Sequence, residues 1–126
     1  MEDKYNKIFN MLNFNVCCVI FFKRNGELRF LFGTRDTDVI RMGKDVEDKI
    51  KMMNHYDTKC NISSGTISVF DIVLGEVRSF QIDRLIEIIN FGEVKSIEKL
   101  GEVYKKYKSL KEGYESKLPK ELMDMV

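Results

Sequence analysis

Arginine is the residue type in this chain with the clearest potential for chemistry. All six arginines lie between residues 24 and 84, whereas lysine is the only basic residue type after residue 94. A guanidinium group is planar and permanently charged, so it pairs with phosphate or carboxylate through two parallel N–H bonds. Two interpretations fit this distribution: a face that binds anions or a partner, or ion pairs between neighbouring strands. The candidate binding residues are the arginines and one adjacent lysine: Lys23, Arg24, Arg29, Arg35, Arg41, Arg78 and Arg84.

Catalytic and metal-binding patterns are weak. His55 is the only histidine, and together with Cys60 it lacks two further ligands at the spacing of a zinc site. Cys17 and Cys18 are adjacent, so on a strand they point to opposite faces and cannot readily share one ion. Neither a glycine-rich phosphate loop nor a nucleophile paired with a base is visible. We therefore expect no enzyme activity, metal or cofactor, and interpret the cysteines as packing residues.

The overall charge is nearly balanced, with 21 basic and 20 acidic residues and a net charge of +1. This balance argues against a strongly basic nucleic-acid-binding protein and against an acidic mimic of nucleic acid. The apolar run 16–22 is too short to span a membrane, and the acidic, polar N-terminus does not resemble a signal peptide. Three cysteines without framework spacing favour a cytoplasmic protein with reduced thiols.

Two similar β-hairpins must position most of the arginines. The first spans residues 21–32, and its Asn25-Gly26 pair favours a two-residue type I′ turn with positive φ at both residues. That turn places Arg24 opposite Glu27 and Phe22 opposite Arg29. The second hairpin spans residues 67–80 and turns around Leu74-Gly75. In this second hairpin we expect Asp71 directly opposite Arg78, as a cross-strand ion pair.

Both faces of the first hairpin are largely apolar, so both must be covered, and the terminal helices are the expected covers. One face is predicted to carry Val19, Phe21, Phe30 and Phe32, and the other Val16, Cys18, Ile20 and Leu31. The predicted core includes Val19, Phe21, Phe30, Phe32, Val69, Phe80 and Ile86.

The complete pattern predicts an α+β, mainly β fold: a five-stranded, bent antiparallel barrel of the Sm-like or SH3-like type. The expected strands are 14–24, 27–35, 66–73, 76–82 and 84–91, and the remaining elements are a helix at 2–12, a turn at 36–38, a helix at 44–56 and a loop at 61–65. The barrel domain is assigned to residues 1–92, with a helical insert at about 43–62, and a C-terminal helical extension to residues 93–126.

The C-terminal helix is expected over residues 93–118, ending before Pro119. Apolar residues recur along it at helical spacing, and Lys111 interrupts their seam. The helix could pack on the sheet or form a homodimer through a short coiled-coil-like contact.

The motifs of the two hairpins resemble the small Sm-like SH3 β-barrel proteins of tailed bacteriophages, a family grouped by name with WYL domains. The resemblance covers about residues 14–90, and Val77 departs from it because an aromatic residue is expected there. The resemblance implies a barrel fold and a phage origin, and it assigns no catalytic residues to this chain. The matching positions are Phe22, Gly26, Arg29, Thr34, Val69, Asp71, Arg78, Ser79, Phe80 and Asp83.

Two functions remain open from the sequence. The first is a non-enzymatic accessory protein that binds RNA or DNA through the arginine-bearing barrel face, because arginine beside aromatic residues can hold phosphates and stack on bases. The alternative is a modulator or inhibitor of a host transcription, replication or defence protein, because arginine, methionine and aromatic residues anchor protein interfaces. No membrane partner is expected.

Overall fold

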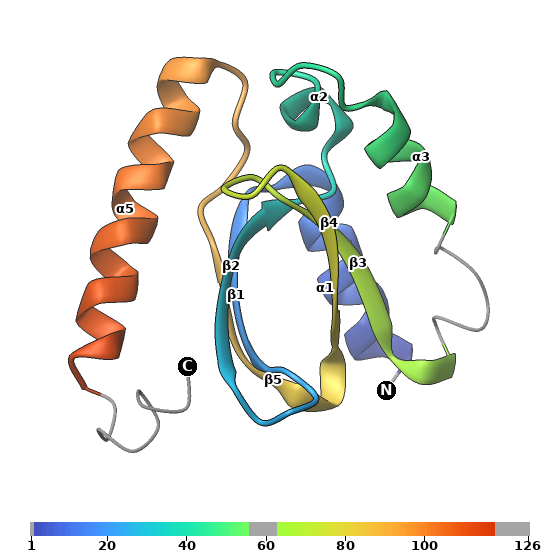
Figure 1. Ribbon diagram of the computed structural model, residues 1–126, viewed down its shortest axis with the longest axis vertical. Coiled ribbons are helices and arrows are strands. Elements are labelled where there is room, and N and C mark those ends of the chain that lie inside the picture. The colour runs from blue at the N-terminus through green and yellow to red at the C-terminus, as the bar shows by residue number, and fades with distance from the viewer. Residues whose placement is uncertain (1, 56–62, 118–126) are drawn as a thin grey trace.

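The structure is a computed structural model that describes residues 2–55 and 63–117 (Figure 1). Its elements in chain order are α1 (Glu2–Phe14), β1 (Cys17–Phe22), β2 (Leu28–Thr34), α2 (Thr37–Ile40), α3 (Glu47–His55), β3 (Thr66–Asp71), β4 (Glu76–Gln81), the 3₁₀ turn η1 (Ile82–Arg84), β5 (Leu85–Asn90) and α5 (Ile97–Glu115). The predictions at Tyr56, at Cys60 and from Leu118 onward lie outside the described residues. No helix among the described residues is long and apolar enough to cross a membrane.

The five strands form one antiparallel sheet in the order β4-β3-β2-β1-β5, which confirms the predicted strand number and the bent antiparallel plan (Figure 1). β2 and β3 form a short ladder, with paired residues at Gly33–Asp71 and Thr34–Phe70. A register shift between Ile20 and Phe21 lets β1 bend where it pairs with β5. The chain reaches β5 from β4 through the 3₁₀ turn η1. In the order of the sheet, β4 and β5 are the two outer strands.

Gly33 lies where β2 pairs with both β1 and β3. A Cβ atom at this position would lie 2.7 Å from the backbone oxygen of Phe70 and 2.6 Å from Cδ2 of Leu31, so a side chain cannot fit without moving the β3 backbone.

We expect Gly33→Ala to lower the free energy of unfolding by about 1–3 kcal/mol, as overpacking does, measured by urea denaturation. Gly101→Ala is the matched control: nothing lies within 4 Å, and alanine should stabilise α5 by up to about 1 kcal/mol. Equal effects would contradict the crowding at Gly33.

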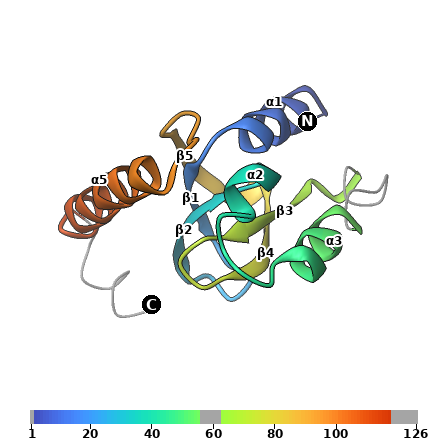
Figure 2. The ribbon, with the colours of Figure 1, turned by 90° about the horizontal axis from the view of Figure 1, so that it is seen from above.

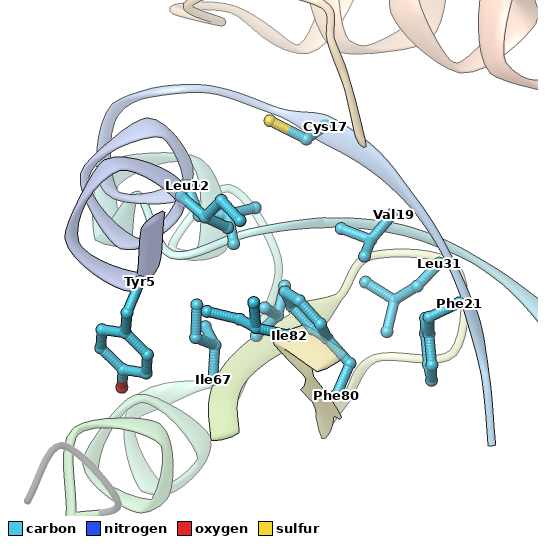
Figure 3. Packing of buried hydrophobic residues seen from close by; sticks show 11 residues of the cluster. Tyr5, Leu12, Cys17, Val19, Phe21, Leu31, Ile67, Phe80 and Ile82 are labelled. Atoms are coloured by element: carbon cyan, nitrogen blue, oxygen red, sulfur yellow. The ribbon is translucent and has the colours of Figure 1, made fainter. Parts of the chain in front are cut away.

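The two terminal helices cover opposite faces of the sheet, as expected (Figures 1 and 2). α1 packs over the inner face, where Tyr5 and Leu12 meet residues of β3, β4 and η1 that include Ile67 and Phe80 (Figure 3). α5 packs on the other face, where Val103 and Tyr107 lie against Phe32. The apolar face predicted for this helix is therefore used mainly within the chain itself.

The insert between β2 and β3 is more helical than predicted. Residues expected to form a turn instead begin α2, with Asp36 as its N-cap: its side chain accepts a hydrogen bond from the Asp38 N–H. The following helix begins at Glu47 rather than at Lys44, because Asp45 adopts a positive φ of 56°, which a helix does not allow. α3 then packs through Ile50 and other apolar residues against Phe70 of β3.

The first hairpin has a different register from the predicted one. Phe21 lies opposite Arg29 and Phe22 opposite Leu28. The loop has three residues rather than two, because the Lys23 N–H donates to the Glu27 carbonyl at 2.8 Å. Within this loop only Gly26 has positive φ, at 88°, so the turn is not of type I′.

This shift of one residue moves the side chains of β2 to the opposite faces from those predicted. Leu31 now shares the inner core with Val19 and Phe21. Phe30 and Phe32 instead face α5, and Phe30 is only partly buried. Ile86 was also assigned wrongly to the core: it is 41% exposed because β5 is an outer strand.

Candidate nucleic-acid interface

Five of the seven predicted binding residues surround one hollow of about 430 Å³. The hollow lies between the tip of the β1–β2 hairpin, strand β4 and the turn η1. In Figure 1 the hairpin tip is at the lower end of the barrel. None of the described residues that line it is acidic. We call it the basic hollow, after its cationic side chains: Lys23, Arg24, Arg29, Arg78 and Arg84.

A hydrogen bond joins two distant segments of the chain at this hollow. The Arg84 guanidinium donates through Nη1 to the Lys23 carbonyl at 2.9 Å, across 61 residues of sequence. This bond ties η1 to the hairpin tip, whose own shape is set by the Gly26 N–H donating to the Lys23 carbonyl at 2.9 Å. The three-residue loop therefore decides where Arg24 lies relative to Arg84.

The cations of the hollow are weakly neutralised by acidic groups. Lys23 pairs with Glu27 at 3.1 Å, and Arg78 pairs with Glu76 at 3.2 Å. Both pairs are partly exposed to solvent, and such pairs contribute only about 0–1 kcal/mol, so an anionic ligand can replace the carboxylates at small cost. Among the described residues, neither Arg24 nor Arg29 forms an ion pair.

Arg78 does not form the predicted ion pair with Asp71. In the second hairpin Asp71 lies opposite Glu76, whereas Arg78 lies opposite Val69. The Asp71 carboxylate instead accepts from the Leu74 N–H at 3.0 Å and holds the four-residue turn between the strands, which sets the register two residues away from the predicted one.

Arg78 also carries an unpaired buried donor. Side chains of a strand alternate, so Arg78 shares the inner face of β4 with the buried Phe80. Its Nε is buried and has no hydrogen-bond partner among the described residues. Because this atom is covered by protein, a ligand meets Arg78 at the outer nitrogens of its guanidinium group, one of which pairs with Glu76.

Arg35 lies apart from the basic hollow and is 4% exposed. Its Nε donates to Asn13 Oδ1 at 3.0 Å, its Nη1 donates to the Ser68 carbonyl, and its guanidinium lies 4.3 Å from the centre of the Phe9 ring. These contacts join α1 to β3. Arg35 therefore has a structural role and does not join the basic hollow, and its predicted part in binding stays a prediction.

Arg41 is also distant from the hollow, in the segment between α2 and α3. It donates through Nε to Glu47 at 2.8 Å, and both side chains are largely exposed. This hydrogen bond lowers the pKa of Glu47 and raises that of Arg41. The pair lies across the start of α3 and does not join the other arginines.

The cysteines of β1 are buried, and their thiols are expected to be unreactive. Burial raises the pKa of Cys17 and of Cys18 to about 12, so both thiols stay protonated at neutral pH. Within residues 2–55 and 63–117, no three His, Cys, Asp or Glu side chains gather closely enough to hold a metal ion.

The neutral polar residues of the hollow are not among the binding residues predicted from the sequence. Thr66, Ser79 and Gln81 line it together with the half-buried ring of Phe22. The signal was the alternation on β4, where Ser79 and Gln81 flank the buried Phe80.

Fold and site together define a small barrel protein with a cationic hollow at one end, and comparison with known proteins gives its family. The chain belongs to the WYL_2 family, of Sm-like SH3 β-barrel fold, whose family model matches residues 6–86. It is similar to a protein of Enterobacteria phage T4 described as "Uncharacterized 11.5 kDa protein in Gp31-cd intergenic region". The two are 36% identical over 80 residues, which cover 61% of this chain and 69% of the phage protein. No solved structure matches.

These matches confirm the family inferred from the hairpin motifs and support a phage origin. The family match includes every residue of the basic hollow and ends before α5.

Proposed function

We propose that this protein is a non-enzymatic phage accessory protein that binds nucleic acid through the basic hollow. The observation that carries the proposal is the gathering of five cationic side chains, from three segments of the chain, around a hollow whose described lining contains no carboxylate. Phosphate oxygens would be bound by the guanidinium groups that line the hollow. The near-neutral net charge of the chain is compatible with this proposal, because a bound phosphate interacts mainly with the local positive charge at the hollow.

The direct test reverses two charges of the hollow. Arg24→Glu combined with Arg29→Glu removes two cations that have no ion-pair partner among the described residues. A hydrogen bond to a charged group contributes about 1.5–3 kcal/mol, so affinity for labelled RNA or DNA oligonucleotides should fall by at least about tenfold. The measurement is fluorescence anisotropy over a series of salt concentrations, where the slope should fall by about 1 for each lost phosphate contact.

The matched control is Lys105→Glu combined with Lys106→Glu, which makes the same change in net charge at two exposed positions of α5. This variant should keep nearly all of the affinity. An equal loss in the control would show a general charge effect rather than a site. Absence of binding to every single-stranded or duplex RNA and DNA tested would refute the proposal.

A second candidate function is modulation of a host transcription, replication or defence protein. It is favoured by Phe14, which is 62% exposed at the end of α1 and lines an open groove of about 800 Å³ between α1, α2 and residues 93–95. A large exposed aromatic residue beside a groove is typical of a protein interface. A stoichiometric partner from host lysate that survives nuclease and is lost with Phe14→Ser would support this function. A homodimer through α5 remains a prediction, to be checked by sedimentation.

A further inference from the structure

A second hollow, of about 250 Å³, lies between β2, the turn that joins β3 to β4, and the second half of α5. We call it the helix hollow. Arg29 lines both this hollow and the basic hollow, so the two are neighbours on the molecule. In Figure 1 α5 stands beside β2, and both elements contribute residues to the helix hollow. The family match ends before α5, so one wall of this hollow lies outside the shared barrel.

Aromatic and aliphatic side chains form most of its wall. Phe32 and Tyr107 are both buried, and their ring centres are 4.9 Å apart. Phe30 is only partly buried, and the Lys111 ammonium lies 5.8 Å from the centre of its ring. A flat ring entering this hollow would meet the accessible part of the Phe30 ring once the flexible Lys111 side chain moved aside. Such a wall favours a planar, aromatic ligand.

The polar groups of the helix hollow include an unpaired hydroxyl. Tyr107 is 6% exposed, and its hydroxyl has no hydrogen-bond partner among the described residues. Burial, and then the nearby Cys18 and Asp71, raise the pKa of this hydroxyl, so it keeps its proton and can donate at neutral pH. The hydroxyl is not one of the buried atoms that lack a partner, so it is accessible from the hollow, where it can donate to a ligand.

The charges around the helix hollow cancel. Its lining contains two cations, Arg29 and Lys111, and two carboxylates, Asp71 and Glu115. Lys111 and Glu115 also pair with each other at 3.8 Å. A phosphate would therefore gain little here, in contrast to the basic hollow. A neutral ring with both donors and acceptors along its edge matches the mixture of carboxylate, ammonium and hydroxyl groups.

We propose that the helix hollow binds a nucleobase. Its volume lies below the range of about 300–1,000 Å³ typical of sites for drug-sized ligands, which suits a single heteroaromatic ring. The base can come from a free nucleoside, or from an unstacked base of a single strand whose phosphates lie in the adjacent basic hollow. In the second case the inference rests on the proposed nucleic-acid-binding function. Recognition of a single-stranded base by stacking and by hydrogen bonds to its edge is a common mode of binding RNA.

The test uses Tyr107→Phe, which removes only the hydroxyl, and compares it with Tyr104→Phe. Tyr104 lies on the same helix, packs against the same Phe32 ring and does not line the hollow. The first probes are two labelled single strands of equal length, one with bases and one abasic, so that the phosphates are matched. The wild-type chain should prefer the strand with bases. Tyr107→Phe should reduce that preference by about three- to tenfold, the effect of one lost hydrogen bond, whereas Tyr104→Phe should leave it unchanged.

The second probes are the free nucleosides adenosine, cytidine, guanosine and uridine, followed by NMR chemical shifts of the α5 amides. Saturable chemical-shift changes on addition of a nucleoside, weakened by Tyr107→Phe, identify a free base as the ligand. If no nucleoside binds, and the preference for the strand with bases over the abasic strand depends on Tyr107, the ligand is a base of the strand. If both strands bind equally and no nucleoside binds, the helix hollow is not a base site while the proposed function stands. If neither strand binds but nucleosides do, the proposed function fails and the base site stands. Binding with no dependence on Tyr107 overturns the inference.

Discussion

Replacing Phe32 with alanine is expected to lower the free energy of unfolding by about 3–5 kcal/mol, the usual range for a buried phenylalanine. Phe32 is 1% exposed, and its ring centre lies 4.9 Å from that of Tyr107, 5.6 Å from Tyr104 and 6.1 Å from Phe91. The ring joins the barrel to α5 and to the segment before it. Its removal leaves a cavity that these partners cannot readily fill, because Tyr104 and Tyr107 are held on α5 and Phe91 in the segment before it.

The measurement is urea denaturation followed by far-ultraviolet circular dichroism. Phe14→Ala is the matched control, since Phe14 is 62% exposed and loses little contact on truncation. We expect this control to change the free energy of unfolding by less than about 1 kcal/mol. A comparable loss in the two variants would contradict the packing of α5 on the sheet.

Replacing Arg35 with alanine should also destabilise the fold strongly, without reducing nucleic-acid affinity. The substitution leaves the Asn13 side chain and the Ser68 carbonyl without their donor, and removes the cation–π contact with Phe9. An unsatisfied buried group costs about 1–3 kcal/mol, so a total loss of about 2–4 kcal/mol is expected. The measurements are urea denaturation, and oligonucleotide binding at a temperature at which the variant is folded.

Arg41→Ala is the comparison for Arg35→Ala. The Arg41 side chain forms an exposed ion pair with Glu47, so its loss should change stability far less than the loss of Arg35. If the folded Arg35→Ala variant bound oligonucleotides more weakly than the wild type, Arg35 would be a binding residue after all. A small loss of stability would show that its buried contacts contribute little.

The first hairpin shows why a sequence can identify an element and still miss its register. Asn25-Gly26 correctly marks a turn, but a glycine with positive φ serves a two-residue turn and a three-residue loop equally well. Register is normally decided by the apolar face that a strand must bury. β2 is apolar on both faces, since Leu31 and Phe32 are both buried, so the apolar pattern could not choose between the two registers.

The arginines show the same limit for the site. The sequence grouped seven basic residues, and the fold brings five of them together while it buries Arg35 and pairs Arg41 with Glu47 elsewhere. Nothing in the local sequence around Arg35 distinguishes it from Arg24. Its role follows from α1, because the Asn13 and Phe9 side chains that surround it are 22 and more residues away in the chain.

The sequence by itself determined the family, the number of strands, the two covering helices and the part of the chain that carries the candidate site. These follow from local patterns: glycine turns, β-rich runs and helical spacing. Tertiary structure alone decided the register of both hairpins, the separation of structural from available arginines, and both hollows. The physical reason is that each of these depends on contacts between distant segments, such as the bond from Arg84 to the Lys23 carbonyl across 61 residues, which no local pattern records.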